Sequence, residues 1–226
     1  MRDPRREPSG DKDKPAPKAV VGRVSLYLRQ LEAFQGQGAA TVSSNQLGTA
    51  LGLNDAQVRK DLAFFGQFGY PGIGYRIDEL STALRRILGI DREWPLALVG
   101  LGNLGRALLK YRGFRNRGFR IVALFDNDPH KIGHAFDGMV VRPIDALADE
   151  VRERSISLAI LSVPADVAQG VADQLVARGI LGIFNFAPKP LVVPPHVSVV
   201  AVDLSVQLEH LAYKTQAAQG GISFIG

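Results

Sequence analysis

The sequence predicts an α/β protein of two domains, in which a small helical domain precedes a domain built on a parallel β-sheet. Apolar residues recur at helical spacing in several short segments of the first 90 residues. Beyond Trp94-Pro95, runs rich in β-branched residues alternate with helical segments, which is typical of a parallel sheet covered on both faces. The first of these runs leads into a Gly-x-Gly-x-x-Gly motif, "GLGNLG", at residues 100–105.

Composition limits the class of protein. The chain has 226 residues, 46% of them hydrophobic, which is enough for one large domain or two small ones. No apolar run approaches the ~18–20 residues needed to span a bilayer, and residues 1–17 lack the apolar core of a signal peptide. We therefore expect a cytoplasmic protein with no membrane partner. Because cysteine is absent, a redox response has to come from a bound ligand.

The first 89 residues carry the basic excess. They hold 13 Lys and Arg against 9 Asp and Glu, whereas residues 90–226 hold 14 against 13. This asymmetry is expected of a domain that meets phosphate, although an ordinary solvated basic face has the same composition. Residues 1–18 are rich in proline and charge and are predicted to be a disordered tail.

Residues 19–89 are predicted to form a winged helix-turn-helix domain. A first helix over 20–34 precedes two short helices, the second of them over 55–65, joined by a "GLN" turn. Ser43 or Ser44 can cap the first of this pair, which Gly52 closes. The Gly- and aromatic-rich segment "GQFGYPGIGYRI" then predicts a tight hairpin, the wing, and residues 78–88 a fourth helix. A plain helical dimerisation domain remains the alternative.

Residues 90–203 are predicted to form a Rossmann-type domain. We expect strands at 96–100, 121–126, 139–141, 157–164, 181–187 and 197–202, and helices at 103–111, 145–154 and 165–178. Gly100 ends the first strand and Gly105 opens the helix that follows. The glycines permit a tight turn and a close approach of backbone to pyrophosphate, while the start of the helix offers free N–H groups.

Asp126 completes the dinucleotide pattern. It lies at the end of the next strand, 21 residues after Gly105, where the fingerprint needs a carboxylate for the ribose 2′-hydroxyl. A carboxylate there repels a 2′-phosphate, so NAD and NADH are predicted ahead of their phosphorylated forms. The alternative is a Rossmann-like domain that has lost its ligand.

Catalytic residues are not indicated. The chain has no Tyr-x-x-x-Lys pair and no second domain for a substrate. Its histidines at 130, 134, 196 and 210 lack the placement of a general base, and Gly133 separates the first two, which argues against a metal pair. A small NAD-dependent oxidoreductase and a sensor that acts through a protein partner stay as alternatives to a DNA-binding repressor.

Several motifs together resemble one family. The segments "SSNQLGTALGLNDAQVRKDLAFFGQFGYPGIGY", "VGLGNLGRAL", "FDNDPHKIG", "VPADVAQGVADQLV" and "GIFNFAP" occur in the order found in the bacterial redox-sensing repressor family Rex, over residues of about 20 to 216. The resemblance implies a homodimer on a palindromic double-stranded operator, released from DNA when NADH binds. It also implies a C-terminal helix, within residues 204–226, that is swapped between subunits.

The resemblance also assigns residues to three sites. For DNA it implies Ser43, Ser44, Gln57, Arg59, Lys60, Gly72 and Tyr75. For NADH or NAD it implies Gly100, Leu101, Gly102, Asn103, Leu104, Gly105, Tyr111, Asp126, Val163, Pro164, Asn185 and Phe186. For the switch between states it implies Arg29, Tyr111 and Asp203. The chain departs from the family in the wing, where Tyr70 and Pro71 replace the basic residues of many relatives.

Overall fold

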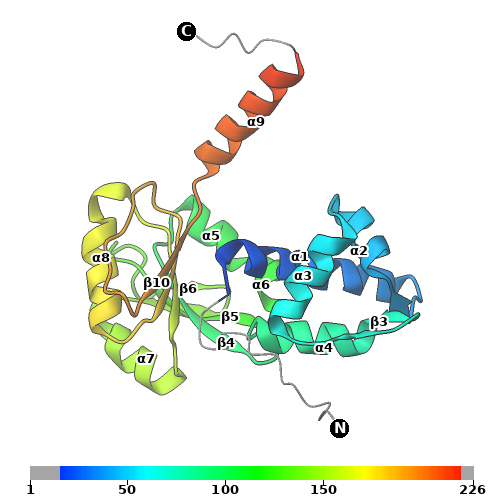
Figure 1. The fold of residues 1–226 in the computed structure, drawn as a ribbon. Coiled ribbons are helices and arrows are strands. Elements are labelled where there is room, and N and C mark those ends of the chain that lie inside the picture. Colours follow the sequence, from blue (N-terminus) through cyan, green and yellow to red (C-terminus); the bar gives the residue numbers. More distant parts are fainter. Residues whose placement is uncertain (1–15, 220–226) are drawn as a thin grey trace. The chain divides into compact units, whose positions relative to one another are not determined.

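The computed structural model describes residues 16–219 and divides the chain into two compact units after Arg92 (Figure 1). Most of the predicted tail, residues 1–15, and the C-terminal residues 220–226 lie outside the described residues. The division expected between residues 89 and 90 lies three residues before the observed one, and Trp94 and Pro95 already belong to the first strand of the second unit.

The first unit consists of four helices and a three-stranded sheet. Its elements are α1 (Lys18–Gly36), β1 (Thr41–Val42), α2 (Ser44–Leu51), α3 (Asp55–Phe65), β2 (Gly69–Tyr70), β3 (Gly74–Arg76) and α4 (Ile77–Ile87). The strands pair antiparallel in the order β1-β3-β2, so the predicted hairpin joins a third strand that lies ahead of α2. This is the winged-helix arrangement that the sequence predicts.

Local signals set the ends of the two central helices. Ser43 and Gln46 form a capping box, and Gly52 closes α2 in the left-handed conformation at φ 68°. The side chain of Asn54 accepts a hydrogen bond from the backbone N–H of Gln57 at the start of α3. Between the helices and the sheet lies one core of buried residues: Val24, Tyr27, Leu28, Leu31, Val42, Leu47, Val58, Leu62, Tyr75, Ile77, Leu80 and Leu84.

The second unit is a seven-stranded sheet of order β10-β9-β8-β4-β5-β7-β6. The strands are β4 (Trp94–Val99), β5 (Phe119–Phe125), β6 (Ala135–Phe136), β7 (Met139–Arg142), β8 (Leu158–Leu161), β9 (Gly182–Asn185) and β10 (Ser198–Ala201). All neighbours are parallel except β6 and β7, an edge hairpin whose first strand the sequence did not reveal because it has only two residues.

Helices cover both faces of this sheet. They are α5 (Asn103–Leu109), α6 (Arg112–Arg115), η1 (Ile144–Ala146), α7 (Leu147–Arg154) and α8 (Ala165–Ala177). Along β4, Ala97 and Val99 join the core under α7 and α8, whereas Leu96 and Leu98 join the core under α5 and α6. The predicted helix over 103–111 in fact ends at Leu109, and the chain turns at Tyr111 into the short α6.

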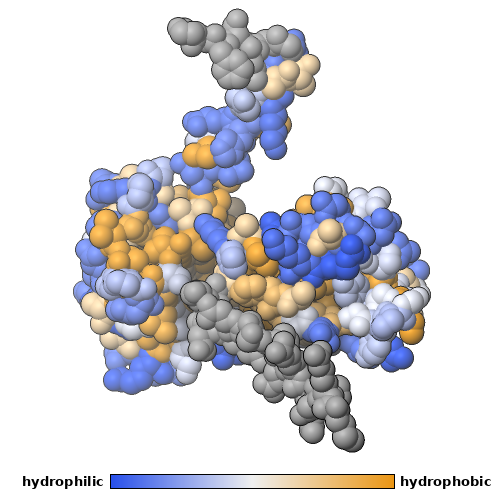
Figure 2. All heavy atoms as spheres, in the orientation of Figure 1, coloured by the Kyte–Doolittle hydropathy of each residue, from blue (hydrophilic) through white to orange (hydrophobic). Residues whose placement is uncertain are grey.

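The last described element is α9 (Leu204–Ala218), which follows β10. None of its residues is buried within the single chain. Its large apolar side chains are well exposed, Leu208 at 67% and Tyr213 at 60%, and Figure 2 shows apolar and hydrophilic residues mixed along it. Across residues 16–219, no helix combines the length and apolar character that a membrane span needs.

Candidate functional site

The glycine loop between β4 and α5 has two positions that admit only glycine. Gly100 has φ +93°, and a Cβ on it would lie 2.4 Å from the carbonyl oxygen of Ser162. A Cβ on Gly105 would lie 1.9 Å from the carbonyl oxygen of Gly100. The hydroxyl of Ser162 donates to that same carbonyl over 2.8 Å, so the loop after β8 braces the glycine turn. Sequence reasoning did not single out Ser162.

The remaining residues of the glycine loop differ in exposure. Leu101 is fully buried and belongs to the sheet core, whereas Gly102 and Asn103 are exposed and Leu104 is 38% exposed. Open space surrounds Gly102 where a Cβ would stand. A ligand can therefore approach the backbone at Gly102, while the Leu101 side chain anchors the turn in the core of the sheet.

Asp126 follows β5 and is 7% exposed. Its Oδ2 accepts from the backbone N–H of Leu101 at 2.7 Å and from Nζ of Lys131 at 3.0 Å, and its Oδ1 accepts from the backbone N–H of Asp128 at 2.9 Å. Burial raises the pKa of this carboxyl, but the backbone donors and Lys131 outweigh burial and hold the pKa below its usual range. The carboxylate thus ties the glycine loop to the loop after β5.

Three bonds leave Asp126 one acceptor position of the roughly four that a carboxylate offers. That position can take a ribose hydroxyl. Asp126 was expected to repel the 2′-phosphate of NADP. The pairing with Lys131 corrects this simple picture, because a cation lies beside the carboxylate. Lys131 stands in the segment "FDNDPHKIG", whose role at the site the residue pattern alone did not reveal.

A cavity of about 700 Å³ opens beside the glycine loop and the end of β5. Its size is in the range of about 300–1,000 Å³ usual for small-molecule sites. Its lining includes Gly100, Gly102, Asp126, Lys131, Ser162, Val163, Pro164 and several residues of α8. Several of the residues assigned to the cofactor thus border one space. The assigned residues that do not line it are Leu101, Asn103, Leu104, Gly105, Tyr111, Asn185 and Phe186.

Asn185 serves its own loop. The side chain is fully buried; its Nδ2 donates to the carbonyl of Lys189 at 2.9 Å, and its Oδ1 accepts from the N–H of Ala187 at 3.0 Å. Both ends of the amide are therefore occupied by the segment that follows β9. The Asn185 side chain thus shapes this loop, and its assignment to the cofactor stays a prediction.

Tyr111 and Phe186 are the ends of a row of aromatic rings. Tyr111 meets Phe114 edge to face at 5.0 Å between centroids, Phe114 meets Phe184 at 6.5 Å, and Phe184 meets Phe186 at 4.6 Å. Such edge-to-face contacts are favourable beyond the burial of area. The two residues that the resemblance assigns to the switch and to the cofactor are thus connected by continuous packing through the second unit.

In the first unit, α3 exposes two cations. Nη1 of Arg59 donates to Oδ2 of Asp55 at 2.7 Å and to the hydroxyl of Ser44 at 3.0 Å, so α3 and the start of α2 are joined at this surface. Lys60 is exposed, and no carboxylate in the described part of the chain pairs with it. Ser43 and Ser44 lie at the N-terminus of α2, beside Arg59.

Asp61, on the inner side of α3, is 2% exposed and accepts four hydrogen bonds. Arg23 donates through Nε at 2.5 Å and Nη2 at 2.9 Å, the Tyr27 hydroxyl at 2.7 Å, and Nε2 of Gln57 at 2.7 Å. Burial raises the pKa of Asp61, but these donors outweigh it and lower the pKa overall. Gln57, which the resemblance assigns to DNA, therefore has one of its amide hydrogens committed to Asp61.

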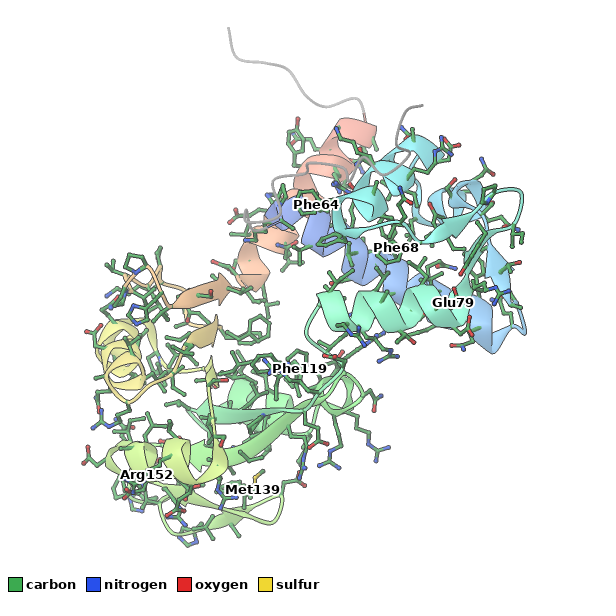
Figure 3. All side chains as sticks on the ribbon, turned by 60° about the horizontal axis from the view of Figure 1, so that its bottom comes forward. Phe64, Phe68, Glu79, Phe119, Met139 and Arg152 are labelled. Atoms are coloured by element: carbon green, nitrogen blue, oxygen red, sulfur yellow. The ribbon has the colours of Figure 1, made fainter. Side chains whose placement is uncertain are left out.

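The wing brings a second correction. Gly72, at φ +75°, is exposed at the turn, but Tyr75 is only 8% exposed and packs in the core of the unit, because alternate side chains of β3 face opposite ways. Tyr70, Ile73 and Arg76 are exposed side chains of the wing. Glu79, labelled in Figure 3, accepts from the Tyr70 hydroxyl at 2.9 Å and from Arg76 at 3.2 Å.

The other switch residues belong to different units. Arg29 is exposed on α1, on the face away from the buried residues of that helix. Asp203 caps α9, its Oδ1 accepting from the N–H groups of Ser205 at 2.9 Å and Val206 at 3.4 Å. Among residues 16–219, no group of three or more His, Cys, Asp or Glu side chains is placed to hold a metal ion.

Family models match both units. Residues 16–63 match a model described as a putative DNA-binding protein N-terminus, and residues 91–189 match one described as a CoA binding domain. The chain is 49% identical over 197 residues to the redox-sensing transcriptional repressor Rex of Carboxydothermus hydrogenoformans, covering 87% of this chain and 95% of that protein. It is 43% identical over 204 residues to the protein of the same name in Streptomyces coelicolor, covering 90% and 79%.

Solved structures extend the likeness to the whole fold. A crystal structure of RSP in complex with NAD⁺ and operator DNA has a TM-score of 0.87 and 34% identity, covering 92% of this chain and 95% of that one. RSP, described as a Rex-family repressor, matches with a TM-score of 0.84, and its complex with NADH with 0.82, each at 33% identity and covering 92% of this chain and 97% of the other.

Proposed function

Because the chain belongs to the Rex family of redox-sensing transcriptional repressors, we propose that it binds operator DNA and releases it when NADH binds. One observation carries the proposal above the rest. The similar repressor RSP has been crystallised with NAD⁺ on operator DNA and also with NADH, so one fold accommodates both ligands of the switch. The curated relatives are named repressors, and we infer that this chain likewise regulates and does not catalyse.

We assign the DNA contact to α3, the start of α2 and the tip of the wing. A helix of this kind reads base edges in the major groove while neighbouring N-terminal and wing groups hold phosphate. Arg59 is suited to guanine and Lys60 to phosphate, and Ser43, Ser44 and Gly72 lie where backbone contacts are expected. Tyr75 is left out of this set because its ring lies in the core.

Gln57 keeps the groups that a bidentate contact with adenine requires. One amide hydrogen is held by Asp61, which leaves the other hydrogen and the oxygen free for adenine N7 and N6. Since a carboxylate can only accept, Asp61 also fixes which end of the amide is nitrogen. The buried network on the inner side of α3 thus supports the orientation of the residue that we assign to base reading.

We place the dinucleotide in the cavity beside the glycine loop. The backbone at Gly102 meets the pyrophosphate, and the free acceptor position of Asp126 takes a ribose hydroxyl. Val163 and Pro164 border the same cavity, and Phe186 follows the neighbouring strand toward the nicotinamide end. The oxidised nicotinamide is cationic and the reduced ring is neutral, so an apolar surface there penalises NAD⁺ by desolvation and admits NADH.

The switch in this proposal lies between subunits. Two chains associate through α9, whose exposed apolar residues need a covering surface, and Asp203 of one chain faces its partner's groups. In the DNA-bound form Asp203 pairs with Arg29, and with NADH bound it turns to the Tyr111 hydroxyl. The aromatic row from Phe186 supports this route, because a shift at the nicotinamide repacks rings that end at Tyr111.

The ligand must distinguish the two forms energetically. Moving a population from 1:99 to 99:1 requires about 5.5 kcal/mol of differential binding, which two dinucleotides per dimer can share. A direct test is a mobility-shift titration of the full chain on a palindromic promoter fragment, with NADH, NAD⁺ or NADPH added. We expect NADH alone to release the DNA. Equal release of the DNA by all three dinucleotides, or by none of them, would contradict the proposal.

A further inference from the structure

The second unit carries a basic segment whose Lys and Arg side chains are used by neither the DNA site nor the dinucleotide site, although Tyr111 of the same segment belongs to the proposed switch. Between residues 106 and 120 there are six Lys and Arg, and no Asp or Glu occurs from 94 to 125. The same segment lines a cavity of about 650 Å³, separate from the one beside the glycine loop. The cationic residues in the lining are Lys110, Arg112, Arg115, Arg120 and Arg154, and the one acidic residue is Asp137.

This cavity lies at the N-terminal ends of the parallel strands, whereas the dinucleotide loop lies at their C-terminal ends. Its lining includes Phe119 to Val122, where β5 begins, whereas the glycine loop follows the end of β4. Because β4 and β5 are parallel, with Trp94 opposite Phe119, both strands begin on one side of the sheet and end on the other. Phe119 and Met139, two of the apolar lining residues, are labelled in Figure 3.

The positive charge in this cavity is only partly balanced. Arg120 pairs with Glu93 at 2.9 Å, and Arg154 pairs with Glu150, a buried residue of α7. For Lys110, Arg112 and Arg115, the described part of the chain supplies no carboxylate within ion-pair distance. Three neighbouring cations in a concave surface repel one another and raise the local concentration of anions.

We propose that this cavity binds a small organic or inorganic polyphosphate. Guanidinium groups hold phosphate oxygens bidentately, and a chain of two or three phosphates can meet several of them at once. A cavity of this volume suits a small ligand. Phe114 and Phe119 add apolar walls against which a nucleoside base can rest. The inference goes beyond the proposed repressor function and does not depend on it.

The test is a calorimetric titration of the full chain with sodium tripolyphosphate at 150 mM salt, with and without saturating NADH. We compare the double variant Arg112→Ala/Arg115→Ala with the control Arg86→Ala/Arg152→Ala, which removes two exposed cations outside the cavity. We expect the first variant to weaken binding about a hundredfold, because each guanidinium that is removed costs about tenfold, and the control to leave binding unchanged. Retained NADH binding shows that both variants are folded.

Three outcomes would overturn the proposal. They are no binding at millimolar tripolyphosphate, equal weakening in both variants, and abolished binding when NADH is present, which would assign the anion to the glycine loop. A parallel titration with uridine 5′-triphosphate separates the two sources of the ligand. Tighter binding than tripolyphosphate identifies a nucleotide, and equal binding identifies the phosphate chain alone.

Discussion

Replacing Asp61 by asparagine is expected to destabilise the N-terminal unit by about 3 kcal/mol, at the lower end of the cost of breaking a buried ion pair. The side chains have nearly the same shape, so the substitution changes charge and hydrogen bonding and leaves packing almost intact. Asp61 is 2% exposed, and each of its oxygens accepts two hydrogen bonds, one of them from Arg23.

The magnitude follows from that geometry. Whichever way the new amide turns, its nitrogen faces a donor of Arg23, and the two hydrogen bonds at that position cannot form. Hydrogen bonds to a charged group contribute about 1.5–3 kcal/mol each, but Arg23 is 26% exposed and regains part of this from water. A destabilisation of about 3 kcal/mol is a large share of the roughly 5–15 kcal/mol that stabilises a domain.

The assay is urea unfolding combined with amide hydrogen exchange of peptides from α1 and α3, because two units need not unfold together. Asp55→Asn is the matched control. Asp55 lies on the same helix and pairs with Arg59, but both side chains are exposed, 40% and 54%, so its removal should cost under about 1 kcal/mol.

Acid should erase the difference between the wild type and Asp61→Asn. Because the folded-state pKa of Asp61 lies below its unfolded value of about 3.9, the carboxylate stabilises the fold above that pH and ceases to do so as pH falls through the folded pKa. A difference under about 1 kcal/mol at pH 7, or one that persists undiminished at pH 2, would refute this account of the network.

Three further substitutions test the proposed sites. Arg59→Ala should flatten base preference at one operator position by about 1–3 kcal/mol, and a uniform weakening on all DNA would make Arg59 a phosphate contact. Asp126→Ala should weaken NADH binding and favour NADPH, because the carboxylate no longer repels a 2′-phosphate and Lys131, still 3.4 Å from Asp128, is released from Asp126. Unchanged selectivity in fluorescence titrations would assign ribose recognition to another residue. Tyr111→Phe should bind NADH normally yet release DNA poorly in mobility shifts, whereas abolished NADH binding would confine Tyr111 to the pocket.

Short-range signals carried most of what the sequence predicted. The capping residue Ser43, the closing Gly52 and the tight turn at Gly100 act within a few residues, so their effects can be read from the sequence itself. The alternation of strands and helices likewise predicted the parallel sheet. These features need no knowledge of which distant segments meet.

The errors came from contacts between distant segments. The sequence did not single out Asp61, because its partner Arg23 lies 38 residues away. Tyr75 looked like a wing residue until pairing with β1 turned its ring into the core. Burial of polar groups is decided by tertiary partners, which a local pattern does not contain.

The bare α9 links the protein's abundance to its activity. A helix of 15 residues is marginal by itself in water, where about 12–15 residues are the minimum for measurable helicity, so its order depends on a surface that covers it. If a second copy supplies that surface, assembly obeys mass action, and the melting temperature rises with protein concentration. Repression would then begin at a threshold number of molecules per cell, and a cell that dilutes the chain by growth would lose repression without any change in its redox state.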